Sequence, residues 1–202
     1  MHCPTRAHYR ECSCIRVPNR SARAQGRAGN AVTRLVPTAE MTLGPFFPPE
    51  FGQGANDLTV LDGRRAKGEV IEIGGRVTQL DGKPLDNLIV EIWQADSQGR
   101  FDSLEFFGWG RAATDAQGNY VFRTIKPGAC PGRAPHVNFL LLYSGLMRQL
   151  QTVMFFDGKP DPVLDAVQPR SLRERLVSRR NGDRYVFDIR LRGEGETPFF
   201  DD

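Results

Sequence analysis

The sequence predicts an all-β protein: a β-sandwich of mixed or antiparallel sheets with one short helical excursion. Two observations lead to this prediction. Short segments rich in β-branched and aromatic residues follow one another along the chain, and clusters of Gly, Pro, Asp and Asn separate them. The composition agrees, because 21 Gly and 14 Pro in 202 residues are typical of a globular chain with many loops.

Each element has its own signal. Residues 70–78 and 88–95 read as strands, and the turn sequence Asp81-Gly82-Lys83-Pro84 between them predicts a hairpin. Only residues 163–179 carry a helical stripe, in which Leu172, Leu176 and Val177 are apolar and Pro169 is an interruption. The remaining predicted strands cover residues 119–125, 136–143, 151–156 and 184–191.

The N-terminal segment differs from the rest of the chain in charge. Residues 1–40 hold seven Arg and two acidic residues, a formal charge of +5, which leaves −2 for the remainder of a chain whose total is +3. Residues 1–33 show no helical or strand period and too few apolar side chains to offset the cost of ordering, so we predict a disordered basic segment. It is also compatible with a start codon assigned too early or with an organelle transit peptide. The folded domain is expected over residues 34–202.

Charge and cysteine content exclude several function classes. The rest of the chain after residue 40, here called the body, is mildly acidic and lacks the excess of basic residues that nucleic-acid binding requires. No apolar run approaches the roughly 18 residues of a membrane span, and the N-terminus lacks the apolar centre of a secretory signal, so a cytoplasmic setting is predicted. Cys3, Cys12 and Cys14 precede the body and Cys130 is its single thiol, which excludes a disulfide framework.

The densest cluster of unusual residues lies just before and within the strand predicted at 136–143. His136 and Asn138 are spaced to point to one face of that strand, with Val137 and Phe139 on the other. Two polar side chains on one face could line a cleft, or could be the solvent-facing side of a half-buried strand. No phosphate-binding or nucleophile signature occurs in the body.

Several motifs in order resemble the intradiol ring-cleavage dioxygenases. They are Thr42-Leu43-Gly44-Pro45-Phe46-Phe47, Ile92-Trp93-Gln94-Ala95-Asp96, Gly108-Trp109-Gly110-Arg111, Arg133-Ala134-Pro135-His136-Val137-Asn138 and the tail from Gly193 to Asp201. The resemblance runs from about Arg34 to the C-terminus and implies a β-sandwich core. Within the family the chain is most similar to the iron-free, α-type subunits of hetero-oligomeric members.

The resemblance also implies which residues replace the iron ligands. Catalytic members hold Fe(III) with two Tyr and two His, and these positions fall here at Phe101, Cys130, His136 and Asn138. One ligand of four survives, and a hard trivalent ion needs anionic oxygen ligands. We therefore expect no metal, cofactor or catalytic residue in this chain alone, and a vestigial pocket formed by these four residues and Arg133. The resemblance places Arg133 near substrate, where it could bind an anion or form a salt bridge.

The implied partner is a β-type catalytic subunit that carries the Fe(III). The resemblance implies that Thr42, Gly44, Pro45 and Phe46 reach into the partner's pocket, where a protocatechuate-like aromatic acid and O2 react to give 3-carboxy-cis,cis-muconate; alternatively this segment only seals the interface. Two other functions stay open. The chain could be an independently active catechol dioxygenase with altered ligands, or a non-catalytic β-sandwich module that binds small aromatic acids.

Overall fold

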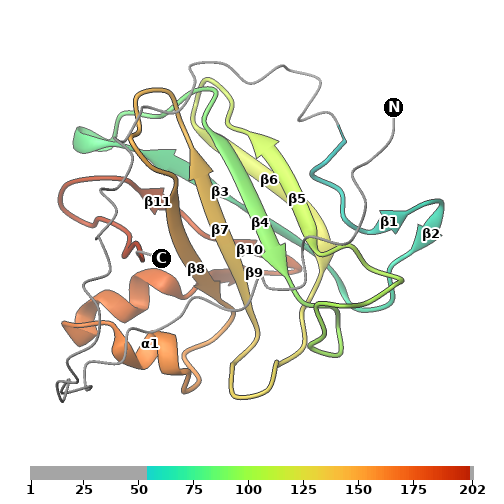
Figure 1. Cartoon of the computed structure of the whole chain (residues 1–202). Coiled ribbons are helices and arrows are strands. Elements are labelled where there is room, and N and C mark those ends of the chain that lie inside the picture. The colour runs from blue at the N-terminus through green and yellow to red at the C-terminus, as the bar shows by residue number, and fades with distance from the viewer. Residues whose placement is uncertain (1–53, 201–202) are drawn as a thin grey trace, which may run out of the picture.

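Two β-sheets face each other across one hydrophobic core in the computed structural model, which describes residues 54–200 (Figure 1). The predicted disordered segment 1–33 and the predicted interface residues Thr42, Gly44, Pro45 and Phe46 lie outside the described residues. A two-stranded ribbon of β1 (Val60–Leu61) and β2 (Arg64–Arg65) stands beside the sandwich. The all-β prediction is confirmed.

The first sheet is mixed. Its central strand β3 (Val70–Thr78) pairs antiparallel with β6 (Asn119–Ile125) and parallel with β10 (Arg184–Val186) and β11 (Ile189–Arg190). Strand β9 (Arg179–Asn181) pairs antiparallel with β10. The second sheet is antiparallel throughout, in the order β5 (Trp109–Ala113), β4 (Ile89–Gln94), β7 (His136–Leu142) and β8 (Leu150–Phe155).

The hairpin predicted from residues 70–78 and 88–95 is wrong. Strand β3 pairs with β6, whereas β4 lies in the other sheet between β5 and β7. The tight turn exists as a 3-10 turn at Leu80–Gly82, in which Asp81 and Gly82 both have positive φ. After that turn the chain crosses to the second sheet. The apolar faces of β3 and β4 then face each other across the core, whereas in a hairpin the two strands would be neighbours in one sheet.

The core lies between the sheets and follows the alternation of each strand. On β7 the inward side chains are Val137, Phe139 and Leu141, all with 1% exposure or less. They meet the apolar side of the first sheet, to which β3 contributes Ile71 and Ile73. Because Val137, Phe139 and Leu141 point inward, the residues between them on β7 face the outside of the sandwich.

A helical layer covers part of that outer face. The α-helix α1 (Pro162–Ala166) and the 3-10 helix η4 (Arg170–Leu176) follow β8, and they lie beside it in Figure 1. This agrees with the helical segment predicted near 163–179, and Pro169 separates its two parts as expected. Their apolar side chains, with those of β8, form a second cluster of Ala134, Val153, Phe155, Val163, Leu164, Val167 and Leu176. The outer face of the second sheet is thus enclosed at the β8 side.

Candidate functional site

Two strands, β4 and β7, bring polar and aromatic side chains together on the outer face of the second sheet. His136 and Asn138 of β7 point away from the core, opposite in direction to Val137 and Phe139. Trp93 of β4 is the direct cross-strand neighbour of Asn138, and opposed residues of an antiparallel pair share a face. The chain therefore places Trp93, His136 and Asn138 on one surface.

Arg133 is held at the margin of this surface by a buried ion pair. Its Nε donates to Asp161 Oδ2 over 2.8 Å, and the two side chains are 8% and 0% exposed. Asp161 Oδ2 also accepts from the Ala134 amide at 2.9 Å, while its Oδ1 accepts from the Val163 amide at 2.8 Å and so caps α1. Three donors share the charge of one carboxylate, which fixes Arg133 against the start of the helical layer.

His136 is buried and neutral. Its Nδ1–H donates to the Ala134 carbonyl at 2.7 Å, and the residue is 2% exposed. Burial lowers the pKa of His136, and the charge of Arg133 acts in the same direction, while the Ala134 carbonyl and Asp161 act against them. With the hydrogen on Nδ1, the ring presents Nε2 as a hydrogen-bond acceptor.

The lowered pKa of His136 makes stability depend on pH. Since the native state holds this imidazole neutral, the unfolded state binds more protons as the pH falls below the ordinary histidine pKa of about 6.5. We expect the free energy of unfolding to fall between pH 7.5 and pH 5.5 by more in the wild type than in His136→Phe. Urea unfolding at both pH values measures this, and equal pH dependence in the two proteins would contradict it.

The unpartnered polar atoms of the structure concentrate here. Within residues 54–200, the buried side-chain nitrogen and oxygen atoms without a hydrogen-bond partner are Trp93 Nε1, Arg133 Nη1 and Nη2, His136 Nε2 and Asn138 Oδ1. Buried polar atoms normally have partners, so their gathering around one surface marks it as a candidate site. We call Trp93, Arg133, His136 and Asn138 the polar cluster.

The other two predicted pocket residues lie at the edges of this region. Phe101 stacks on Trp93 with ring centroids 6.4 Å apart, and Phe107 meets Trp93 edge-on at 6.0 Å. Cys130 is half-buried and is not in a disulfide. It opens a tight turn in which the Arg133 amide donates to the Cys130 carbonyl at 3.0 Å. Phe101 thus belongs to an aromatic group at the β4 side, and Cys130 orients the backbone that leads to Arg133.

The donor atoms at these positions do not fit Fe(III). A phenyl ring, a thiol, an imidazole and a carboxamide supply no anionic oxygen, which a hard trivalent ion requires. The buried guanidinium of Arg133 adds a positive charge next to His136 that opposes any cation. No group of three or more His, Cys, Asp or Glu suited to a metal ion occurs in the part of the chain that the structure describes.

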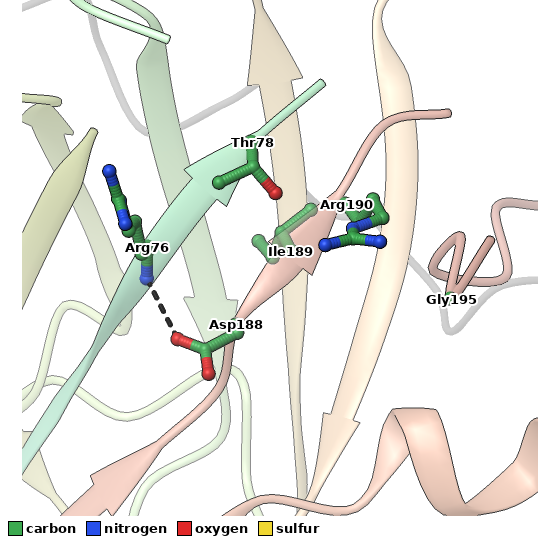
Figure 2. A pocket seen from close by; sticks show the side chains of 6 residues that line it. All are labelled: Arg76, Thr78, Asp188, Ile189, Arg190 and Gly195. Carbon is green, nitrogen blue, oxygen red and sulfur yellow. Dashed lines mark hydrogen bonds between the residues drawn. The ribbon is translucent and has the colours of Figure 1, made fainter. Parts of the chain in front are cut away.

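A hollow lies elsewhere, on the first sheet. It measures about 450 Å³ and is lined by Arg76, Thr78, Asp188, Ile189, Arg190 and Gly195 of the β3–β11 edge and the following loop (Figure 2). Its charged groups already have partners. Arg76 Nε donates to the Gln117 carbonyl at 2.6 Å, Asp188 Oδ1 accepts from the Arg76 amide at 3.1 Å, and Arg190 donates to the Glu194 carbonyl. We therefore place the candidate site at the polar cluster.

None of the helices over residues 54–200 has the length and apolar character needed to cross a bilayer.

Sequence reasoning missed Asp161 and Trp93 as parts of this region. For Asp161 a signal existed: an Asp directly before Pro at the start of an apolar helical stripe is an N-cap signature. For Trp93 none existed, because its proximity to Asn138 depends on the register of β4 against β7. That register follows from long-range packing.

Comparisons with known proteins agree with this fold and indicate the family of the chain. Residues 42–193 match a family model described as "Dioxygenase". The chain is 39% identical to the protocatechuate 3,4-dioxygenase beta chain of Burkholderia cepacia, over 81% of this chain and 84% of that one. It is 32% identical to the alpha chain from the same organism, over 84% and 100%. Among solved structures, the dioxygenase domain of a dioxygenase and carbohydrate-binding fusion protein from Streptomyces sp. SirexAA-E superposes with a TM-score of 0.56 at 28% identity, covering 81% of this chain and 100% of that one.

Proposed function

We propose, from the premise that this chain belongs to the intradiol ring-cleavage dioxygenases, that it is the iron-free, α-type subunit of a protocatechuate 3,4-dioxygenase. The observation that carries the proposal is the donor set at Phe101, Cys130, His136 and Asn138. The chain keeps the fold of the family, but these four side chains offer no anionic oxygen to Fe(III). The iron then belongs to a β-type partner, and the two chains act as one oxidoreductase.

The sequence of this chain is more similar to the beta chain named above, at 39% identity, than to the alpha chain, at 32% identity. Identity over a whole domain is dominated by core and turn positions, whereas metal binding depends on a few ligands. The higher identity to a beta chain favours one second candidate, a chain with its own ring-cleaving activity. The neutral donors and the nearby Arg133 guanidinium argue against that candidate.

The proposed contribution of this chain to catalysis is to shape the partner's pocket. Thr42, Gly44, Pro45 and Phe46 would do so, and the family match that begins at residue 42 supports their inclusion in a domain spanning residues 34–202. Thr42 offers a hydroxyl and an amide to an anionic group, and Pro45 fixes the backbone beside it. The assembled pair would exclude water and hold a protocatechuate-like acid for reaction with O2, in a cytoplasmic setting.

Purification of the chain alone and together with a β-type chain that retains both Tyr and both His ligands tests this function. We expect the two chains to co-elute in size-exclusion chromatography. Iron content and O2 consumption with protocatechuate should appear only in the pair. Stoichiometric iron or ring cleavage in the isolated chain would overturn the proposal in favour of the independent enzyme. Failure to associate would overturn the partnership itself.

A further inference from the structure

The hollow on the first sheet is lined by side chains of two neighbouring strands on the outer face of the sandwich (Figure 2). Val77 of β3 and Ile189 of β11 are register partners, and both are fully buried in the core. Because side chains alternate along a strand, Arg76 and Thr78 of β3 point outward, and so does Arg190 of β11. The chain thus gathers three polar side chains on the sheet opposite to the polar cluster.

The two arginines of this surface have hydrogen-bond partners but no counter-charge. Arg76 Nε donates to the Gln117 carbonyl at 2.6 Å, and Arg190 donates to the Glu194 carbonyl, so both acceptors are neutral. Neither guanidinium forms an ion pair with a carboxylate of residues 54–200. A hydrogen bond to a carbonyl orients a guanidinium without cancelling its charge. The lining therefore holds two positive charges that its neighbours leave uncompensated.

Asp188, the acidic residue of the lining, does not supply the missing charge. Its Oδ1 accepts from the Arg76 main-chain amide at 3.1 Å, and its Oδ2 forms a salt bridge with Arg179. The carboxylate is thus held by a backbone group and by a third arginine that matches its charge. The surface combines three guanidinium groups with one carboxylate, a net charge of +2. Such a surface favours an anionic ligand.

The spacing of the two uncompensated arginines is set by the sheet. Thr78 and Arg190 are directly opposed across β3 and β11, and Arg76 comes two residues before Thr78. With strands about 4.8 Å apart and a rise of about 3.3 Å per residue, the Cα atoms of the two arginines are roughly 8 Å apart. In Figure 2 their guanidinium groups lie on either side of Thr78. Two separate cations therefore flank one hydroxyl.

Each of these groups keeps donors for a ligand. Arg76 Nη1 and Nη2, and Arg190 Nε and Nη2, have no hydrogen bond to residues 54–200, so each guanidinium retains an edge of two donors. A carboxylate can meet such an edge with two parallel hydrogen bonds. The Thr78 hydroxyl likewise has no partner in the described chain. The hollow of about 450 Å³ is of the size that small-molecule sites have.

We propose that this hollow binds a small organic dicarboxylate, with one carboxylate on Arg76, the other on Arg190, and the Thr78 hydroxyl donating to the ligand. An anion with charges at two ends matches two cations that the sheet holds apart. A compact anion such as phosphate meets one guanidinium better than both. The site goes beyond the proposed subunit function and does not depend on it, because it lies on the other sheet.

Isothermal titration calorimetry on the purified full chain tests the site at low ionic strength, where exposed charges are least screened. Succinate, glutarate and adipate are the probes, because they differ only in the distance between their carboxylates. We expect saturable binding of one molecule per chain for the best of them. Butyrate, with one carboxylate, should bind about tenfold or more weakly, since it loses one set of charge-assisted hydrogen bonds. Equal affinity for butyrate or phosphate, or no dicarboxylate binding at millimolar concentration, would overturn the proposal.

Variants assign the binding to this hollow. Arg76→Gln and Arg190→Gln should each weaken binding of the best dicarboxylate about tenfold or more. Arg184→Gln is the matched control: Arg184 lies on the outer face of the same sheet, but its charge is paired with Glu72 at 3.3 Å. It removes the same formal charge and should bind like the wild type. The Arg-rich residues 1–40 also attract anions, but they are the same in every variant. Equal losses in the three variants, or unchanged binding by folded Arg76→Gln and Arg190→Gln, would refute the site.

Discussion

Replacing Phe139 by alanine is expected to lower the free energy of unfolding by about 3–5 kcal/mol. Phe139 is 1% exposed on β7 of the second sheet. Its ring meets Phe187 at 5.1 Å and Tyr120 at 6.0 Å, and both of these residues lie in the first sheet or in the segment between its strands β10 and β11. The side chain therefore joins the two layers, and a rigid sandwich cannot close the space that its loss would leave.

Guanidinium unfolding followed by circular dichroism measures this loss. Leu104→Ala serves as the control, because Leu104 is 72% exposed and its truncation should change stability by less than about 0.5 kcal/mol. A loss below about 1 kcal/mol for Phe139→Ala would show that the sheets relax around this position. That result would contradict a core that depends on contacts between the two layers.

The strands could be predicted because their signals are local. Val70–Thr78 and Asn119–Ile125 combine β-branched or aromatic residues with turn residues at their ends, and the structure has these bounds. Strand β5 (Trp109–Ala113) was not predicted, because Gly and Ala give it little strand signal. Gly110 is there because a Cβ would come within 2.5 Å of the Leu58 side chain. That requirement arises from tertiary packing.

Strand pairing could not be predicted from the same signals. The turn at Asp81-Gly82 resembles a hairpin turn, yet β3 and β4 belong to opposite sheets. The turn residues predict only that the chain reverses direction. The sheet that the next strand joins depends on which apolar faces are buried against each other. The same limit applied to the candidate site. The shared face of His136 and Asn138 follows from alternation along one strand, but their meeting with Trp93 depends on register between strands.

From the sequence, Arg133 could bind an anion or form a salt bridge, and the structure bears on this choice. The salt bridge exists, through Nε to Asp161. It uses one of the three guanidinium nitrogens, and the other two remain buried without partners in the described chain. The salt bridge therefore accounts for one edge of the side chain, and anion binding by the other two nitrogens stays a prediction. No pattern in the sequence distinguishes those edges.

Asp161→Asn is expected to lower the free energy of unfolding by about 3–5 kcal/mol, because it removes one partner of a buried ion pair. Asp161 uses both oxygens: Oδ1 accepts from the Val163 amide, and Oδ2 accepts from the Ala134 amide and Arg133 Nε. An asparagine has one oxygen, so either orientation turns its NH2 group toward donors. Arg133, 8% exposed, would then lack a counter-charge.

Asp165→Asn is the matched control for this change. Asp165 also pairs with an arginine of the helical layer, Arg173 Nη1 at 2.9 Å, but its side chain is 55% exposed. Water can replace that partner, so the variant should lose less than about 1 kcal/mol. Chemical unfolding of both variants at pH 7.5 gives the comparison. Equal, small losses would mean that Arg133 finds another partner or reaches solvent when Asp161 is neutral, and the buried pair would then not be what fixes the guanidinium beside His136.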